Sequence, residues 1–292
     1  MSVCIVEFQK EKEYQNLLSN FYVKDHVKMA LMEDIGYGDI TTENLASESD
    51  FLKGELNTRS EGVLCGCDVF KTVYETLSDK VDIKFYFKDG DRIKKGDKIA
   101  DISGPAKDLL MGERVALNYI QRMSGIATET RKYQDAIAPY SAKIVDTRKT
   151  TPNFRAFEKY SVKVGGGALH RFNLSDCAMI KDNHIRLAGS LTKAVNKLRE
   201  SISHAHKIEV ECDTLEQVKE AVAVKADIIM LDNMSVEQMK QAVDIINHQA
   251  IVEASGNVKL DTVNAIASTG VDIISSSAIV AKAPTLDLAL DM

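Results

Sequence analysis

The second half of the sequence alternates short apolar runs with longer stretches of helical periodicity. The apolar runs read AKIVDT, CAMIKD, KIEVEC, ADIIMLDN, AIVEASG and VDIISSS, and stretches such as LEQVKEAVAV, VEQMKQAVDIINH and LDTVNAIAST lie between them. Such alternation predicts parallel strands joined by helical crossovers. At least six units, about 20 to 35 residues apart, favour an incomplete TIM-like α/β barrel. No G-x-G-x-x-G motif follows any run, so a doubly wound dinucleotide-binding sheet is the weaker prediction.

The residues before this pattern are organised differently. Residues 1–20 show no clear period and are predicted to be a flexible extension. Apolar residues at helical spacing from Phe21 predict a helix that ends at Gly36. Over residues 53–105, short alternating runs between Asp-Gly turns predict a small antiparallel sheet, and residues 69–77 predict a helix packed across it.

The longest helix-like stretch runs from Leu109 to Ile137 and is predicted to be interrupted near Ser124-Gly125. This stretch suits a helix that links two domains. We therefore predict an N-terminal α+β sandwich domain over residues 21–122 and an α/β barrel domain over residues 123–292, whose last segment packs back on the first domain. Arg114 lies in the linking helix, where a salt bridge at the surface or an interface is the commoner role for a lone arginine.

The predicted strand ends are where a barrel would hold its reacting groups, because all βα loops leave from one face. Every end is polar or charged: Thr147-Arg148-Lys149, Lys181-Asp182, Glu211, Asp232-Asn233, Glu253 with Ser255-Gly256, and Ser275-Ser276-Ser277. One such end would mean little, because Asp and Asn often begin turns and cap helices. Six ends that converge on one mouth predict a site with both cations and carboxylates.

The cations of this site predict a ligand with several negative groups. Arg148 and Arg171 have planar groups suited to two-point capture of carboxylate or phosphate, whereas Lys149 and Lys181 are compact point charges. Two glycine-containing loops are weaker indications of a ligand site. Gly165-Gly166-Gly167 allows close backbone approach, and Ser255-Gly256-Asn257 can present N–H groups to a phosphate.

The carboxylates and histidines keep more than one interpretation. Glu211 and Asp232 can bind Mg²⁺ bridged to substrate phosphates, can grip sugar hydroxyls, or can only balance the neighbouring cations. His170 and His184 are each consistent with a proton carrier and, at least equally, with a hydrogen-bonded scaffold residue.

Composition narrows the class of partner. The net charge of −6 argues against general nucleic-acid binding, which normally needs a basic face. No apolar run approaches the roughly 20 residues that cross a bilayer, and the charged first residues do not resemble a secretory signal. We expect a cytoplasmic protein without a membrane segment, whose five scattered cysteines are free thiols rather than zinc ligands.

The sequence resembles the nicotinate-nucleotide pyrophosphorylase (carboxylating) family, also called quinolinate phosphoribosyltransferases. The matching stretches follow the family order from about residue 22 to the C-terminus. They are EDIGYGDITT (33–42), ER with ALN (113–118), SGIAT (124–128), DTRKT (146–150), EKY (158–160), GGG with HR (165–171), IKDNH (180–184), EVE (209–211), DN (232–233) and EASG (253–256).

The resemblance implies a type II phosphoribosyltransferase of pyridine nucleotide (NAD) biosynthesis. The implied reaction converts quinolinate and phosphoribosyl pyrophosphate to nicotinate mononucleotide, pyrophosphate and CO₂, with Mg²⁺. It also implies an N-terminal sandwich, an incomplete barrel, and a homodimer in which the sandwich of one subunit covers the barrel mouth of the other. Assembly beyond the dimer is left open.

The resemblance also implies roles for the residues singled out above. The set that would hold the quinolinate carboxylates is Arg148, Arg171 and Lys181, with Arg114 from the partner subunit. The set that would attend phosphoribosyl pyrophosphate and its metal is Lys149, Glu211 and Asp232, which are the catalytic candidates. The 5′-phosphate would bind at Ser255-Gly256-Asn257 and Ser275-Ser276-Ser277, and Thr147 and His170 complete the substrate-binding set. The family often has glycine in the last loop, where this chain has Ser276 and Ser277, whose hydroxyls could substitute for backbone donors.

Two other functions stay open at the level of sequence. A molybdenum-linked paralogue of the same family would share the phosphoribosyl-binding face, although Lys181 to His184 and His170-Arg171 favour quinolinate. A non-catalytic barrel that binds a phosphate ligand would release neither pyrophosphate nor CO₂.

Overall fold

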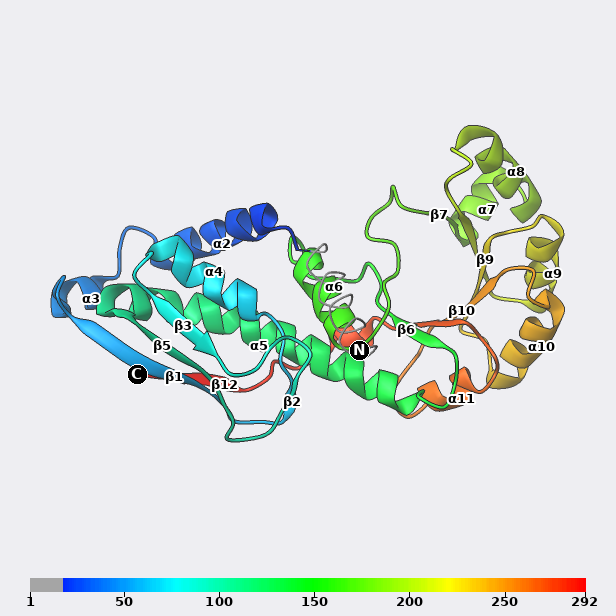
Figure 1. Ribbon diagram of the computed structural model, residues 1–292. Helices are drawn as coiled ribbons and strands as arrows, with labels where there is room; N and C mark the ends of the chain where they lie inside the picture. Colours follow the sequence, from blue (N-terminus) through cyan, green and yellow to red (C-terminus); the bar gives the residue numbers. More distant parts are fainter. Residues whose placement is uncertain (1–17) are drawn as a thin grey trace, which may run out of the picture. The chain divides into compact units, whose positions relative to one another are not determined.

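The computed structural model describes residues 18–292, so nearly all of the predicted extension over residues 1–20 lies outside the described residues. The chain divides into two compact units (Figure 1). Of the described residues, the first unit contains 18–131, Pro152–Gly166 and Ala283–Met292, and the second contains Lys132–Thr151 and Gly167–Lys282. The predicted domain boundary after residue 122 falls inside helix α5 (Ala106–Ala136).

The first unit is built around the predicted antiparallel sheet, whose strand order is β12-β1-β5-β3. Side chains of α2 and α4, which lie side by side in Figure 1, pack with the sheet in one apolar core that includes Leu56, Phe70, Tyr74 and Ile99. The elements are α2 (Asn20–Ile35), α3 (Ile40–Leu45), β1 (Phe51–Thr58), β2 (Gly62–Val63), α4 (Cys67–Leu77), β3 (Asp82–Phe85), β4 (Arg92–Ile93), β5 (Lys98–Pro105) and β12 (Leu288–Asp291).

Helix α5 is continuous, so the predicted interruption near Ser124-Gly125 is wrong. A Cβ at Gly125 would lie 1.9 Å from the carbonyl oxygen of Pro284. The glycine therefore serves close packing of the C-terminal segment against the helix, and this packing outweighs its low helix propensity. Beside it, Arg122 forms a 2.9 Å ion pair with the buried Glu158 of α6 (Arg155–Val164).

The second unit contains the predicted parallel strands, in the order β6-β11-β10-β9-β8-β7. Among the described residues, β6 and β7 do not pair with each other, which agrees with an incomplete barrel. The strands are β6 (Lys143–Val145), β7 (Ala178–Ile180), β8 (Ile208–Cys212), β9 (Ile228–Asp232), β10 (Ile251–Ser255) and β11 (Ile273–Ser275). The helices are α7 (Asp182–Ala188), α8 (Leu191–Ser201), α9 (Leu215–Ala223), α10 (Val236–Ile246), α11 (Val263–Ala267) and α12 (Ala278–Ala281).

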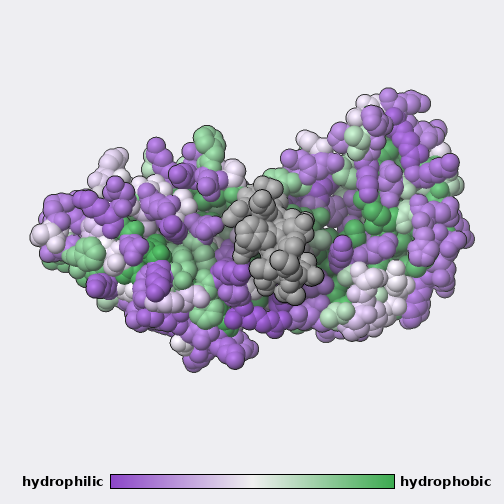
Figure 2. Space-filling view, viewed as in Figure 1, coloured by the Kyte–Doolittle hydropathy of each residue, from purple (hydrophilic) through white to green (hydrophobic). Residues whose placement is uncertain are grey.

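The crossover helices begin where the sequence provides caps. Thr214 and Gln217 form a reciprocal capping box at the start of α9, and Ser235 and Gln238 form one at the start of α10. Figure 2 shows that the outer surfaces of α8, α9 and α10 are mostly hydrophilic, as expected for helices that bury only one face. No helix among residues 18–292 is both long and apolar enough to span a bilayer.

Candidate functional site

The strand register of the second unit places polar residues in layers on one face of the sheet. Met230 of β9 is level with Glu211 of β8 and with Glu253 of β10, and two residues later Asp232 is level with Ser255. Because side chains alternate between faces along a strand, these residues share a face. The predicted site residues of this unit are Thr147, Arg148, Lys149, His170, Arg171, Lys181, Glu211, Asp232, Ser255, Gly256, Asn257, Ser275, Ser276 and Ser277.

Lys181 and Glu211 form an ion pair at the ends of neighbouring strands. Lys181 directly follows β7, and its Nζ donates to Glu211 Oε2. The Glu211 side chain is 16% exposed and that of Lys181 is 43% exposed. The cation is therefore accessible from solvent, while a largely buried carboxylate orients it.

The loop after β6 carries the second group of cations. Thr147 Oγ1 accepts the Lys149 N–H at 3.0 Å, which turns the chain and leaves Lys149 exposed and Arg148 half-buried. Arg171 lies beside β7, where its guanidinium donates to the Cys177 carbonyl oxygen at 2.9 Å and contacts Met179 Sδ at 3.4 Å. The other N–H groups of the Arg171 guanidinium can donate hydrogen bonds to a ligand carboxylate.

Asp232 is held by a chain of amide groups that the sequence did not reveal. The Asn233 side-chain amide donates to Asp232 Oδ2 at 2.7 Å, and Asn257 donates to Asn233 Oδ1 at 3.0 Å. Gly256 has φ 90°, and a Cβ at this position would lie 2.2 Å from Asn233 Oδ1. The loop after β10 can therefore pack against Asn233 only with glycine at position 256.

The Ser275 to Ser277 loop is less open than its sequence suggests. Ser275 and Ser276 are buried. The Ser276 hydroxyl accepts the Ala278 N–H at 3.3 Å and faces the Val258 carbonyl oxygen at 3.5 Å. Ser277 is half-buried and is the most accessible hydroxyl of the three.

Arg114 and His184 occupy different places. Arg114 is an exposed residue of α5 in the first unit. His184 Nδ1 accepts the Lys181 N–H at 3.0 Å at the start of α7, so His184 has the scaffold role that its sequence left open. The four cysteines of the described part of the chain are free thiols.

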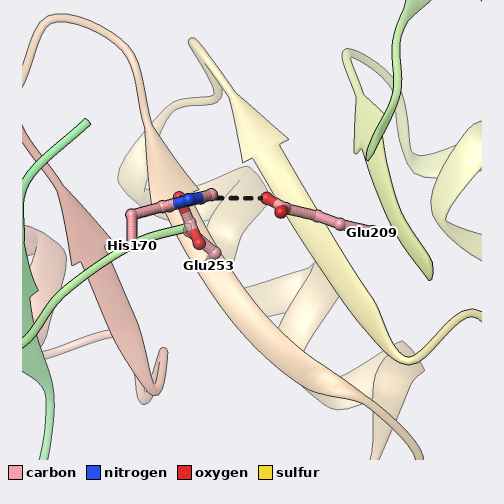
Figure 3. A group of neighbouring side chains, drawn as sticks. All are labelled: His170, Glu209 and Glu253. Atoms are coloured by element: carbon pink, nitrogen blue, oxygen red, sulfur yellow. Dashed lines mark ion pairs between the residues drawn. The ribbon is translucent and has the colours of Figure 1, made fainter. Parts of the chain in front are cut away.

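The second unit also contains a cluster of His170 with the buried carboxylates Glu209 and Glu253 (Figure 3). His170 Nε2 is 3.5 Å from Glu209 Oε1 and 3.4 Å from Glu253 Oε1. The two carboxylate side chains are only 1% and 2% exposed. Sequence patterns gave Glu209 no role, because it lies inside an apolar strand. Its partner, His170, comes from a loop distant in the sequence.

The cluster has a high affinity for one additional proton. Burial lowers the pKa of His170, but the two carboxylates raise it to about 10 overall. Burial also raises the pKa of Glu209, with the charge of Glu253 acting in the same direction and His170 opposing it. Both shifts describe the same proton, because the His170 imidazole and the Glu209 carboxyl group are in contact and titrate as a unit.

The tautomer of His170 argues against a metal at this cluster, although three side chains converge there. The Arg171 N–H donates to His170 Nδ1 at 2.8 Å, so Nδ1 carries no proton and Nε2 carries one. A protonated Nε2 cannot ligate a metal ion, and metal-bound histidines normally donate from their other nitrogen. We conclude that Nε2–H faces the two carboxylates, and that the raised pKa values of His170 and Glu209 describe a proton shared within the cluster.

Comparisons with known proteins support a single family. A family model described as "Quinolinate phosphoribosyl transferase, N-terminal domain" matches residues 39–124, and one for the C-terminal domain matches residues 126–291. The chain is similar to a "Probable nicotinate-nucleotide pyrophosphorylase (carboxylating)" of Synechocystis, with 44% identity over 90% of each chain. A Bacillus subtilis protein of the same name is 40% identical over 94% of this chain and 95% of its own. The crystal structure of NadC from Streptococcus pyogenes is similar with a TM-score of 0.91 and 42% identity, over 94% of this chain and 97% of that chain.

Proposed function

The chain belongs to the quinolinate phosphoribosyltransferase family, and on this premise we propose that it makes nicotinate mononucleotide from quinolinate and phosphoribosyl pyrophosphate, releasing pyrophosphate and CO₂. Such an enzyme is a pentosyltransferase of NAD biosynthesis. The observation that carries the proposal is the layered set of side chains at the carboxyl end of one parallel sheet. Cations follow the two end strands β6 and β7, and the carboxylates Glu211 and Asp232 lie on the adjacent strands β8 and β9.

The cations fit a substrate with two neighbouring carboxylates on a pyridine ring. Arg148, Arg171 and Lys181 would bind these carboxylates and orient the ring nitrogen toward the ribosyl carbon C1′. The nitrogen lone pair then forms the new bond to C1′, while the bond from C1′ to the pyrophosphate oxygen breaks. Lys149 would offset the negative charge that develops on the departing pyrophosphate.

Loss of CO₂ follows from the first step without a protein nucleophile. Once the ring nitrogen is ribosylated and positively charged, the bond between C2 and its carboxylate breaks and leaves the electron pair on C2. A proton then takes the place of the carboxylate, which completes nicotinate mononucleotide. The protein contributes by binding the remaining carboxylate and excluding bulk water.

We further propose that Glu211 and Asp232 hold Mg²⁺ together with the substrate diphosphate. The two carboxylates lie on adjacent strands and share a face, one layer apart. Mg²⁺ commonly takes one or two protein carboxylates and completes its shell with phosphate oxygens and water, so this pair fits. The ion would supply positive charge to the leaving pyrophosphate. The loops at Ser255-Gly256-Asn257 and Ser277 would bind the 5′-phosphate.

Arg114 would bind the substrate in the active site of the partner subunit of a homodimer. Two observations support this proposal: Arg114 is exposed, and it belongs to the first unit, whereas the other predicted cations belong to the second. Mixing inactive Arg114→Ala and Arg171→Ala subunits tests this proposal, because each mixed dimer would contain one site with neither substitution. Restored activity would support sharing between subunits. Mixtures that exchange subunits and stay inactive would refute it. We place the enzyme in the cytoplasm.

The decisive assay is incubation with quinolinate, phosphoribosyl pyrophosphate and Mg²⁺, with nicotinate as a parallel substrate. Equal amounts of pyrophosphate and CO₂ from quinolinate, and no turnover of nicotinate, would support the proposal. Binding without either product would indicate a phosphate-ligand binding protein. Pyrophosphate release only with another acceptor would indicate a paralogue, such as a molybdenum-linked one.

A further inference from the structure

The proposed mechanism uses neither Glu209 nor Glu253, although both are costly to bury. Glu209 lies two residues before Glu211 on β8, and Glu253 lies level with Glu211 on β10. Each is at least 98% buried, and the Oε1 atom of each has no well-formed hydrogen bond within the described part of the chain. A buried carboxylate persists only where a partner offsets its desolvation.

His170 is this partner, and it comes from a loop rather than a strand. Its Nε2 atom is near both carboxyl groups, which project from different strands, and in Figure 3 its ring points toward Glu209. The other edge of the ring accepts the Arg171 N–H, and the His170 N–H donates to the buried Asp146 Oδ1 at 2.9 Å. The two carboxyl groups thus fix the ring, and the ring fixes the backbone of its neighbour.

That neighbour is the arginine assigned to the substrate. With its backbone fixed, the Arg171 side chain reaches the Cys177 carbonyl oxygen and Met179 Sδ, which hold the guanidinium beside β7. We propose that Glu209 and Glu253 are positioning residues that act through His170 to place Arg171 for a substrate carboxylate. This inference rests on the proposed function, since it concerns the binding of quinolinate.

The tautomer of His170 determines how the two glutamates act on Arg171. While Nε2 keeps its proton and faces the two carboxyl oxygens, Nδ1 accepts the Arg171 N–H. If the acceptors at Nε2 are removed, the ring can rotate or move its proton to Nδ1, where it would oppose the Arg171 N–H. Removing both acceptor groups should therefore displace Arg171 even though neither glutamate touches the substrate.

The test compares substitutions that remove the acceptor with substitutions that keep it. The Glu209→Met/Glu253→Met double variant removes both carboxyl oxygens at similar volume, whereas Glu209→Gln/Glu253→Gln retains acceptor oxygens. We expect the methionine variant to raise KM for quinolinate at least about tenfold, the scale of one charge-assisted hydrogen bond, and KM for phosphoribosyl pyrophosphate less than about twofold. The glutamine variant should stay within about threefold of the wild type for both substrates.

Two controls separate positioning from general damage. Met230→Leu alters a buried residue of the same face, on the strand between the two glutamates, and should leave both KM values unchanged. In an Arg171→Ala background the methionine substitutions should add almost nothing to KM for quinolinate, because their effect passes through Arg171. Equal rises in both KM values, or fully additive effects in the Arg171→Ala background, would overturn the proposal.

The imidazole itself gives a readout that does not depend on activity. In ¹⁵N-histidine-labelled wild-type protein, His170 should show an unprotonated Nδ1 and a protonated Nε2, and the methionine variant should lose this pattern. A methionine variant that fails to fold still leaves the wild-type pattern decisive, since a protonated Nδ1 would refute the coupling. A wild type that does not convert quinolinate would refute the proposed function instead, so the two failures are distinguishable.

Discussion

Replacing Gly256 with alanine should destabilise the loop after β10 by a predictable amount. The residue has φ 90°, and a Cβ there would lie 2.2 Å from Asn233 Oδ1 and 2.9 Å from the Asn233 backbone nitrogen. The left-handed backbone costs alanine about 1–2 kcal/mol. Overlap with the Asn233 side chain and with its backbone nitrogen, which cannot rotate away, adds about 1–3 kcal/mol. We therefore expect Gly256→Ala to lower the free energy of unfolding by about 2–5 kcal/mol.

Gly270→Ala is the matched control for this substitution. Gly270 has nearly the same φ, 91°, but a Cβ there would lie 3.5 Å from Val243 Cγ1, which is an ordinary contact. Its cost should therefore be only the backbone contribution of about 1–2 kcal/mol. Urea denaturation of both variants isolates the overlap with Asn233 as the difference between them.

Gly256→Ala should also change the KM for one substrate more than the KM for the other. Asn233 donates to Asp232 and accepts from Asn257, so a displaced Asn233 moves both residues proposed to attend the phosphoribosyl substrate. KM for phosphoribosyl pyrophosphate should rise more than KM for quinolinate. Equal losses of stability in Gly256→Ala and Gly270→Ala, together with an unchanged KM for phosphoribosyl pyrophosphate, would refute the reasoning.

Three other changes test separate parts of the structure. Arg148→Ala and Arg171→Ala should each raise KM for quinolinate at least about tenfold, because a charge-assisted contact contributes about 1.5–3 kcal/mol, and unchanged kinetics in both would remove the carboxylate assignment. Arg122→Met should lower the free energy of unfolding by about 3–5 kcal/mol in denaturation experiments, because the fully buried Glu158 would lose its ion pair. The folded cluster of His170 and Glu209 binds more protons than the same residues do in the unfolded chain. The free energy of unfolding should therefore fall as pH rises from 6.5 toward about 10. If the cluster causes this fall, Glu209→Gln should make it smaller.

The strand ends were accessible from sequence because topology alone determines their location. Parallel strands place all of their carboxyl ends at one edge, so Lys181, Glu211 and Asp232 could be grouped without any knowledge of their contacts. The continuous helix through Gly125 could not be predicted, because local propensity opposed it and the decisive contact comes from Pro284, far along the chain.

The hydrogen-bond partners within the site were equally out of reach. Ser276 and Asn233 are polar residues at strand ends, which sequence patterns treat alike. The structure turns the Ser276 hydroxyl into the protein and makes Asn233 the link between Asp232 and Asn257. Which polar residue faces a ligand and which supports another residue depends on side-chain direction, and no local pattern encodes it.

Glu209 and Glu211 show how two residues of one strand acquire different chemistry. They share a side-chain face, but the two-residue step between them takes the carboxylate from 16% exposed to 1% exposed. The outer carboxylate contacts Lys181, which follows β7, and stays available to a ligand, whereas the inner one has a raised pKa and contacts His170. Depth along the barrel axis therefore separates groups that can bind substrate from groups that hold the binding residues in place. Depth is not the only factor, because Glu253 is level with Glu211 in the strand register and is buried by the cover of His170.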